Sequence, residues 1–137
     1  MAAAGDVLQG FYHAIVSRDM PAARSYLADD MIYEGIFKTL RGADAYLTVF
    51  ASFLEFTTRL EVKAIFAEGE NAAVFYEMET TKPAPAVTFA AEWHQVRHGK
   101  IIWAREACDG RPFAPLFASP ARTATAEPRD GRQRFQS

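Results

Sequence analysis

Hydrophobic residues recur at helical spacing in the first part of the chain and alternate with polar residues further on. Residues Asp6–Arg18 are predicted to form an amphipathic helix on this basis. A short second helix is expected to follow, because Asp19 suits an N-cap and Pro21 suits a first helical turn. A third helix is predicted from Gly42 onward, with an apolar face formed by Tyr46, Val49, Phe50 and Phe53.

After Phe56 the pattern changes to the alternation that is typical of half-buried strands. In the first of these strands, the alternation places Leu60, Val62, Ala64 and Phe66 on one side. Strands are predicted at Asp29–Gly35, Thr58–Phe66, Ala72–Thr81, Val87–Val96 and Lys100–Cys108. Helices followed by a run of strands indicate an α+β fold, in which a curved antiparallel sheet carries the helices on one face. A cavity between helices and sheet is a natural ligand site in this layout.

The turn between the last two strands decides which way Glu106 points. If the turn "RHG" is a three-residue loop closed by Gly99 in the left-handed conformation, Val96 pairs with Lys100. Side chains then share a face by parity. The inward face of these two strands carries Glu92, His94, Val96, Ile102, Ala104, Glu106 and Cys108.

The opposite face of the same strands is expected to be the outer surface of the sheet. It carries Trp93, Gln95, Arg97, Ile101, Trp103 and Arg105. Two tryptophans among polar residues are typical of interfaces, so we predict a homodimer through Trp93 and Trp103. A two-residue loop would change this assignment, because Glu92 would then share the face of Trp103 and Arg105.

Burial in the predicted cavity would make the inward polar residues chemically useful. A buried carboxyl group has a raised pKa and a buried histidine a lowered one, which brings Glu92, Glu106 and His94 toward neutral pH. That range suits general acid/base catalysis. Each residue also has a simpler interpretation: Glu106 could pair with Arg105 on an ordinary strand, and His94 could be a core histidine.

Composition and charge narrow the classes of function. The 137 residues suffice for one domain, and 50% hydrophobic residues allow a sizeable core. A net charge of -2 gives no electrostatic support for binding to nucleic acid or to a membrane surface. The single cysteine, Cys108, suits a reducing compartment, and "MAAAGDVLQG" lacks the features of a signal peptide, so a cytoplasmic protein is predicted.

The chain is predicted to contain one domain over residues 1–117 and a flexible polar tail over residues 118–137, with Phe113 and Phe117 as apolar anchors before the tail. No glycine-rich phosphate loop, nucleophile elbow or cysteine pair occurs in the sequence. Nothing in the spacing of Glu92, His94 and Glu106 demands a metal. Neither a cofactor nor a metal is therefore expected.

Three segments together resemble the nuclear transport factor 2-like superfamily, also called SnoaL-like or cystatin-like α+β barrels. They are "SRDMPAARSYLADDMIYEG", "LRGADAYLTVF" and "RHGKIIWAREACD", and the similarity extends over roughly Asp6 to Phe117. The resemblance implies a half-open cone of curved sheet with three N-terminal helices on its concave face, a cavity, and frequent homodimers. Members include ketosteroid isomerase, limonene epoxide hydrolase, scytalone dehydratase, polyketide cyclases and non-catalytic binding proteins, so the fold alone does not define a function.

Residue by residue, the chain is similar to limonene epoxide hydrolase at two positions. Tyr33 corresponds to its tyrosine and Glu106 to one catalytic aspartate. Its arginine and second aspartate correspond to Met78 and Thr80, and its asparagine to Gly35. Epoxide hydrolysis by that mechanism is therefore not expected.

The chain resembles ketosteroid isomerase at one of three functional positions and the polyketide cyclases in having acids in the cavity. Phe11 takes the place of the isomerase's helix tyrosine, Gly35 that of its general base, and Glu92 that of its oxyanion-binding acid. That specific activity is rejected, because two of the three roles are missing. The cyclases use a cavity acid as a base, and either Glu92 or Glu106 could fill this role.

We therefore predict a cavity that binds a small hydrophobic molecule. The catalytic candidates are Glu106, Glu92, His94 and Tyr33, and the expected ligand-binding residues are Phe11, Tyr12, Tyr46, Phe50, Tyr76, Met78, Thr80 and Cys108. One hypothesis is a cofactor-independent acid/base enzyme: a cyclase, isomerase, dehydratase or hydrolase. The alternative is a non-catalytic module of the same fold that binds a ligand or supports a partner. Acids without cationic partners in an open cavity would favour the enzyme.

Overall fold

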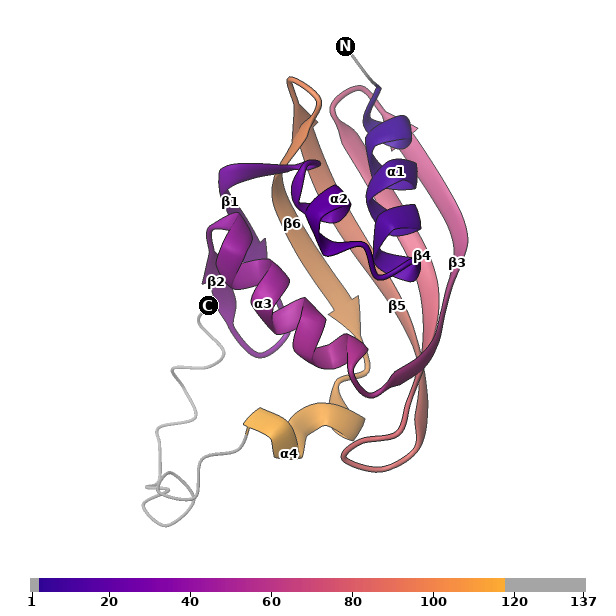
Figure 1. Cartoon of the computed structure of the whole chain (residues 1–137). Helices are drawn as coiled ribbons and strands as arrows, with labels where there is room; N and C mark the ends of the chain where they lie inside the picture. Colours follow the sequence, from indigo (N-terminus) through magenta and orange to yellow (C-terminus); the bar gives the residue numbers. More distant parts are fainter. Residues whose placement is uncertain (1–2, 118–137) are drawn as a thin grey trace, which may run out of the picture.

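Residues 3–117 are described by the computed structural model. In this part of the chain, six strands form one curved, unclosed sheet, and the helices lie on its concave side (Figure 1). The helices are α1 (Ala4–Val16), α2 (Met20–Arg24), α3 (Ala43–Leu54), the short 3₁₀ helix η1 (Arg111–Phe113) and α4 (Ala114–Phe117). The strands are β1 (Leu27–Glu34), β2 (Thr39–Arg41), β3 (Thr57–Glu68), β4 (Asn71–Thr80), β5 (Ala86–Arg97) and β6 (Lys100–Cys108). The predicted α+β fold is confirmed.

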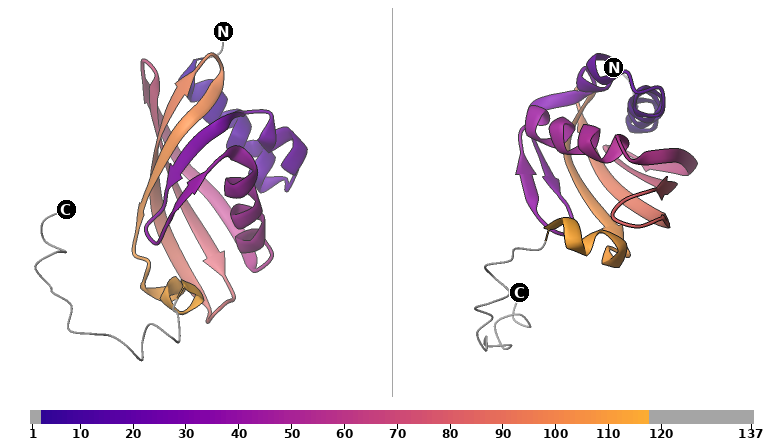
Figure 2. Two further views of the ribbon diagram at one scale, coloured as in Figure 1. Left: turned by 90° about the vertical axis from the view of Figure 1, so that its left-hand side faces the viewer. Right: turned by 60° about the horizontal axis from the view of Figure 1, so that its bottom comes forward.

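The strand order β2-β1-β6-β5-β4-β3 describes how the sheet is built. From β3 to β6, consecutive strands pair antiparallel as predicted. β1 differs, because it pairs parallel with β6, and the short β2, which was not predicted, pairs antiparallel with β1. α3 connects β2 to β3 across the concave side, so the sheet curls around this helix (Figure 2).

The first two helices cover the other end of the concave side. α1 packs against β3, β4 and β5, and its predicted apolar face is confirmed because Leu8, Phe11 and Ile15 are fully buried. α2 begins as the sequence predicts, since the side chain of Asp19 accepts a hydrogen bond from the backbone N–H of Ala22. These helices close the core behind the middle of the sheet.

The turn between β5 and β6 contains two residues rather than three. His98 and Gly99 both have positive φ, 55° and 76°, as in a type I′ hairpin turn. Arg97 therefore pairs with Lys100, and the predicted three-residue loop with Val96 opposite Lys100 is wrong.

A β-bulge next to this turn changes the parity of β6. Ile102 is the extra residue between the pairs Val96–Ile101 and Gln95–Trp103. One inserted residue reverses which side chains face inward, so the bulge compensates for the shorter turn.

Beyond the bulge, the inward and outward faces are those that the longer loop would have produced, although the strands are shifted by two residues relative to the predicted pairing. Glu92 lies opposite Glu106, and His94 lies opposite Ala104. Next to the turn the predicted faces need a correction, because Ile101 rather than Ile102 is fully buried. The inward orientation of Glu106 is thus correct, for a different reason from the one given by the sequence.

A second bulge, in β3, turns Phe66 outward. The register shifts between Val62 and Ala64, so Lys63 is the extra residue. The sequence pattern placed Phe66 on the same side as Val62, whereas the side chain of Phe66 is 65% exposed.

The C-terminal part of the described chain crosses the open end of the cone. The predicted anchor Phe113 is buried and Phe117 is half-buried, and both belong to the short helical segment η1–α4 (Figure 2). The predicted tail, residues 118–137, lies outside the described residues. None of the helices between residues 3 and 117 is long and apolar enough to cross a membrane.

Arg18 joins the end of α1 to the junction of α3 and β3. Its guanidinium group donates to the carbonyl oxygens of Leu54, at 2.5 Å, and Thr57, at 2.7 Å. We expect Arg18→Ala to lower the free energy of unfolding by about 2 kcal/mol, because two charge-assisted hydrogen bonds are lost. Urea unfolding measures the change, with Arg41→Ala at an exposed position of β2 as the control. Equal, small effects of both replacements would contradict the role of Arg18.

Candidate active site

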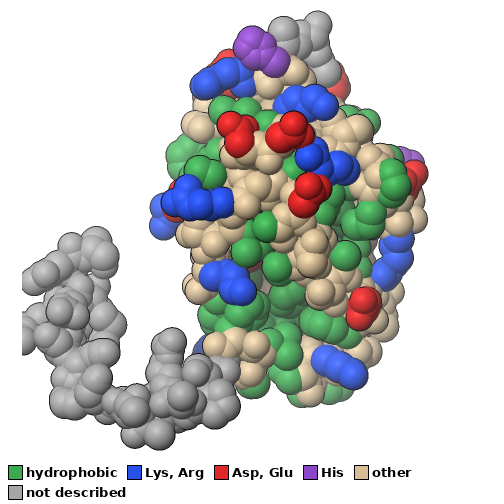
Figure 3. All heavy atoms as spheres, turned by 60° about the vertical axis from the view of Figure 1, so that its left-hand side comes forward, with side chains coloured by type: hydrophobic (Ala, Val, Ile, Leu, Met, Phe, Trp, Pro, Cys, Tyr) green, Lys and Arg blue, Asp and Glu red, His purple; other side chains and the backbone are tan. Residues whose placement is uncertain are grey.

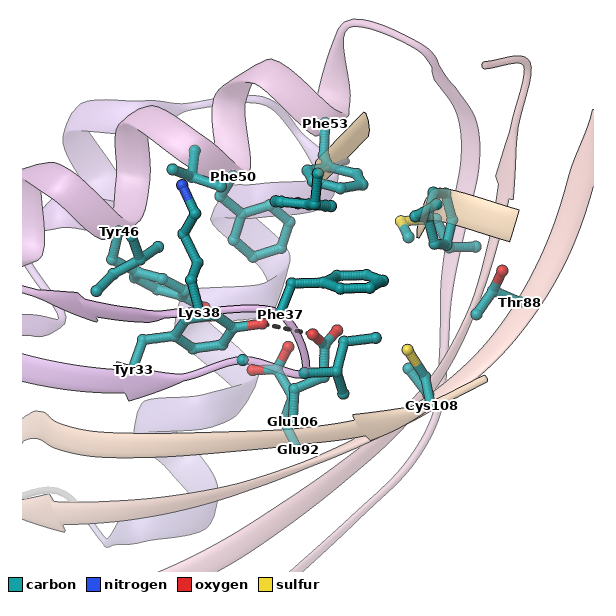
Figure 4. A pocket seen from close by; sticks show the side chains of 18 of the residues that line it. Tyr33, Phe37, Lys38, Tyr46, Phe50, Phe53, Thr88, Glu92, Glu106 and Cys108 are labelled. Carbon is teal, nitrogen blue, oxygen red and sulfur yellow. Dashed lines mark hydrogen bonds between the residues drawn. The ribbon is translucent and has the colours of Figure 1, made fainter. Parts of the chain in front are cut away.

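A cavity lies between the concave side of the sheet, α3 and the C-terminal segment. Its volume is about 80 Å³, and most of its wall is apolar. Figure 3 shows that hydrophobic side chains predominate on the lower part of the face turned toward the viewer, with most charged side chains above them. In the close view, Glu92 and Glu106 project from neighbouring strands into the cavity, and Tyr33 reaches toward them (Figure 4).

Glu92 is the buried acid of this site, with 2% of its surface exposed. Its Oε1 accepts a hydrogen bond from the hydroxyl of Tyr12 at 3.0 Å, and its Oε2 accepts one from the hydroxyl of Tyr76 at 2.9 Å. The Nε2 atom of His94 lies 3.2 Å from Oε1. Both carboxylate oxygens therefore have hydrogen-bond partners although the group is buried.

Glu106 lies directly opposite Glu92 and has fewer partners. Its Oε1 accepts a hydrogen bond of 2.6 Å from the hydroxyl of Tyr33, and its Oε2 lies 3.4 Å from the hydroxyl oxygen of Tyr76. Between residues 3 and 117, neither acid forms an ion pair with a lysine or arginine. In particular, Arg105 is exposed and does not form the ion pair that the simpler interpretation assigned to Glu106.

The environment raises the pKa of Glu106 to about 7 from its ordinary value of 4.5. Burial is the main cause, and the negative charge of Glu92 adds to it. The hydrogen bonds from Tyr33 and Tyr76 act in the opposite direction, because they stabilise the carboxylate. A carboxyl group that exchanges its proton near neutral pH is suited to general acid/base catalysis.

Tyr76 connects the two acids. Its single hydroxyl hydrogen can be donated to one carboxylate only, and the shorter distance assigns it to Glu92. When Glu106 is protonated, its O–H can in turn donate to the oxygen of Tyr76. The pair then holds one proton and one negative charge, which is favoured because two like charges in a buried site repel each other.

His94 and Tyr12 are set back from the cavity wall and contact Glu92 from behind. His94 is fully buried, and its Nε2 also lies 3.4 Å from the hydroxyl oxygen of Tyr12. Its Nδ1 has no hydrogen-bond partner among residues 3–117. With its proton on Nε2, the imidazole donates to Glu92, so this histidine can position the acid without reaching a ligand.

The residues proposed from the sequence fall into two groups. Those that line the cavity are Tyr33, Tyr46, Phe50, Tyr76, Met78, Glu92, Glu106 and Cys108. Phe11, Tyr12, Thr80 and His94 do not line it. Phe11 packs behind Tyr46, with stacked rings 6.3 Å apart. Burial raises the pKa of Cys108 to about 12, so its thiol stays neutral in the cavity wall.

Sequence reasoning missed the residues at the mouth of the cavity. They come from the segment before β2, from β2 itself and from the C-terminal helical segment: Ile36, Phe37, Lys38, Leu40, Phe113 and Phe117. Phe37 stacks on Phe117 at 4.4 Å, and Lys38 Nζ lies 5.8 Å from the centre of the Phe117 ring. The adjacent apolar residues in "EGIFK" were a signal, but the partner of Phe37 could not be read from it.

Comparison with known families identifies the chain. The family model of the SnoaL-like domain matches residues 8–104, which is well over half of the sequence. The chain belongs to the SnoaL-like domain family. The predicted resemblance is thereby confirmed, although Glu106 lies just beyond the matched residues. No curated protein matches the sequence.

Solved structures of other proteins share the SnoaL-like fold of this chain. A protein from Kribbella flavida is 28% identical with a TM-score of 0.76, over 92% of this chain and 98% of that one. An LEH-like epoxide hydrolase from M. tuberculosis is 19% identical with a TM-score of 0.68, over 90% and 96%. A putative SnoaL-like polyketide cyclase from Mesorhizobium loti is 17% identical with a TM-score of 0.64, over 74% and 96%. The latter two similarities establish the fold alone.

The raised pKa of Glu106 predicts a pH dependence of stability. Between the ordinary value of 4.5 and the folded value of about 7, the folded state binds this proton more tightly than the unfolded chain does. Protonated Glu106 therefore contributes fully to the free energy of unfolding below about pH 4.5. This contribution is lost as the pH rises through about 7, and the loss is about 3 kcal/mol at most.

Chemical denaturation between about pH 5 and about pH 8 tests this expectation. The decrease in stability should be smaller in Glu106→Gln than in the wild type, because the amide stays neutral throughout. Glu68→Gln, at an exposed position of β3, is the matched control and should follow the wild type. The same decrease in Glu106→Gln and the wild type would show that Glu106 ionises normally.

Proposed function

We propose that this SnoaL-like protein is a cofactor-independent acid/base enzyme that acts on a small hydrophobic molecule. The observation that carries the proposal is the carboxyl group of Glu106, which lies in a mostly apolar cavity without a cationic partner among the described residues and has a pKa near 7. Such a group can remove a proton from a substrate and return it at neutral pH.

Glu106 is assigned the role of the proton-transferring residue, and the neighbouring groups set its charge. Tyr12, Tyr76 and His94 all contact Glu92, and the negative charge of Glu92 raises the pKa of Glu106. Tyr33 donates to Glu106 and orients the carboxyl group toward the cavity. This division resembles other sites in which two carboxyl groups have different environments and therefore different protonation states.

The simplest reaction for this site is the transfer of a proton to Glu106 from a substrate carbon next to a carbonyl group. Isomerisation, aldol-type ring closure and elimination of water can all begin with this step, so it is the part common to most of the reactions considered. The fold shared with an LEH-like epoxide hydrolase and a putative polyketide cyclase is compatible with small-molecule chemistry in the cavity. The shared fold does not indicate which of these reactions takes place.

The alternative function is binding without turnover, and one observation favours it. The cavity is small and its mouth is crowded by aromatic side chains, including the stacked pair Phe37 and Phe117. A protein that only stores or presents a hydrophobic ligand needs such a wall and does not need a proton-transferring acid.

Hydrogen exchange in a simple ketone separates the two functions. In deuterated water, the protein is expected to accelerate exchange of the α-hydrogens of α-tetralone, with a rate that rises as Glu106 ionises near pH 7. Glu106→Gln should lower the protein-dependent rate by about 100-fold or more, and Glu68→Gln should leave it unchanged. NMR measures the exchange. Rates that are equal in the wild type and in Glu106→Gln would refute the catalytic role.

We further infer that two copies associate through the outer face of the sheet. Phe66, Val87, Phe89 and Trp93 are 65%, 58%, 57% and 49% exposed, and they belong to the strands β3 and β5. Such a concentration of exposed apolar side chains on one face supports an interaction surface. The Trp93 and Trp103 rings pack edge to face at 4.8 Å, so the predicted pair forms one aromatic unit at this surface.

Sedimentation velocity tests the dimer. The wild type is expected to sediment as a dimer, and Trp93→Lys as a monomer, because a buried ammonium group at the interface is strongly unfavourable. Val16→Lys on α1 is the control, since Val16 is also 49% exposed but lies away from the sheet face. A monomeric wild-type protein at high concentration would rule out the dimer.

A further inference from the structure

The two acids of the cavity lack a positively charged partner in the described chain. Glu92 and Glu106 lie opposite each other on β5 and β6, and between residues 3 and 117 neither forms an ion pair with a lysine or arginine. Buried charges are strongly unfavourable unless they are paired. A proton on Glu106 removes one of the two charges, and a positively charged ligand beside the acids would have the same effect.

Lys38 lies in the cavity wall but does not reach the acids. It is the one lysine or arginine among the described residues that line the cavity, and its side chain is exposed. Its Nζ lies 5.8 Å from the centre of the Phe117 ring, at the mouth, and points away from Glu92 and Glu106 (Figure 4). The lining residues therefore leave the acid end without a positive charge.

A third polar group at this end has no partner. Tyr46 Oη makes no hydrogen bond with residues 3–117, although Tyr46 is 2% exposed and lines the cavity. The ring of Tyr46 lies 4.7 Å from that of Tyr33, whose hydroxyl contacts Glu106. A buried hydroxyl without a partner is unfavourable, and its oxygen can accept a hydrogen bond. A ligand at this end would therefore meet two carboxyl groups and one hydroxyl group.

An ammonium group matches these polar groups. It carries a positive charge and several N–H donors, and it has no acceptor. The carboxyl groups of Glu92 and Glu106 supply acceptors of opposite charge, and Tyr46 Oη supplies another. Hydrogen bonds between ionised groups are about twice as strong as those between neutral groups. A neutral alcohol of the same shape would gain only the weaker kind of bond.

The rest of the wall suits a compact apolar group. Phe50 lies 5.7 Å from Tyr46, measured between ring centres, and Phe53, Met78 and Ala90 extend the apolar surface. Aromatic rings also attract a nearby ammonium group. The cavity volume is about 80 Å³. A cavity of about 150 Å³ holds benzene, so a short alkyl chain fits best beside the acids.

We propose that this cavity binds a protonated primary amine with a compact apolar body, and that Glu92, Glu106 and Tyr46 hold its ammonium group. The inference rests on the proposed function in placing the substrate in this cavity, and it names the class of that substrate. An ammonium group beside Glu106 favours the carboxylate form. That form is the one that accepts a proton from a substrate carbon.

The groups around Glu106 determine how binding depends on pH. They are Tyr33 from β1, Tyr46 from α3, Tyr76 from β4, Glu92 from β5 and Cys108 on β6 itself. Burial raises the pKa of the tyrosines and of the cysteine, so these groups stay neutral. Because Glu106 has a pKa of about 7, affinity for the amine should fall by about tenfold per pH unit below that value.

NMR titration with isopentylamine and isopentyl alcohol tests the proposal. The two probes have the same shape and differ in the charged group. At about pH 8 the wild type should bind the amine at least about tenfold more tightly. This preference should decrease toward about pH 5, where Glu106 is protonated. Glu106→Gln should abolish both the preference and its pH dependence, and Glu68→Gln should retain both.

Binding of the alcohol by Glu106→Gln shows that the cavity of this variant is intact. Equal affinities of the wild type for the two probes at about pH 8 would overturn the proposal. A preference that Glu106→Gln retains, or that does not change with pH in the wild type, would overturn it as well. If Glu106→Gln does not fold, the two wild-type measurements still decide the matter.

The exchange experiment with α-tetralone is independent of this result, because that ketone is neutral and carries no ammonium group. Exchange that depends on Glu106, without a preference for the amine, would keep the catalytic role and remove the amine as the substrate class. A preference for the amine without such exchange would keep the ligand class and remove the catalytic role.

Discussion

Two carboxyl groups face each other across neighbouring strands inside an apolar wall, and the rest of the site is arranged so that one of them can remain charged. Glu92 is surrounded by Tyr12, Tyr76 and His94, whereas Glu106 shares Tyr76 and has Tyr33 in addition. Two like charges buried on directly opposite residues repel each other, and no cation of the described chain neutralises them. Burial and the neighbouring charge of Glu92 together raise the pKa of Glu106 to about 7, so this acid can hold a proton and release it near neutral pH.

The alternation of residues in the sequence predicted the strands and the inward direction of both acids. The local detail was less predictable, since the loop at His98 and Gly99 is shorter than expected and the bulge at Ile102 reverses the parity again. Either feature alone would have turned Glu106 away from Glu92. A bulge depends on how a strand fits its neighbour, which periodicity in a single strand does not contain. The same limit explains why Phe66 was placed on the wrong face.

The partners of the acids were harder to predict than the acids themselves. Tyr33 was chosen through a family resemblance, and the structure brings its hydroxyl to Glu106. The position of Tyr76 between the acids follows from the register of β4 on β5, which no pattern along one strand reveals. The mouth formed by Phe37 and Phe117 joins segments far apart in the sequence. Contacts of this kind are decided by tertiary packing, not by local propensity.

The parallel pairing of β1 with β6 has a consequence for how the protein is made. Among the strands of residues 3–117, the long neighbour of β1 is β6, and Tyr33 and Glu106, on these two strands, are 73 positions apart. Tyr12 and Glu92 are 80 positions apart. Closing such long segments of chain costs conformational entropy, and this cost is offset only when the contacts of the whole sheet have formed. On the ribosome, the tyrosines emerge well before the acids they will contact. The pair of acids can therefore be completed only when synthesis has passed β6, and a chain that ends before β6 contains α1, α2, α3 and most of the sheet but lacks Glu106.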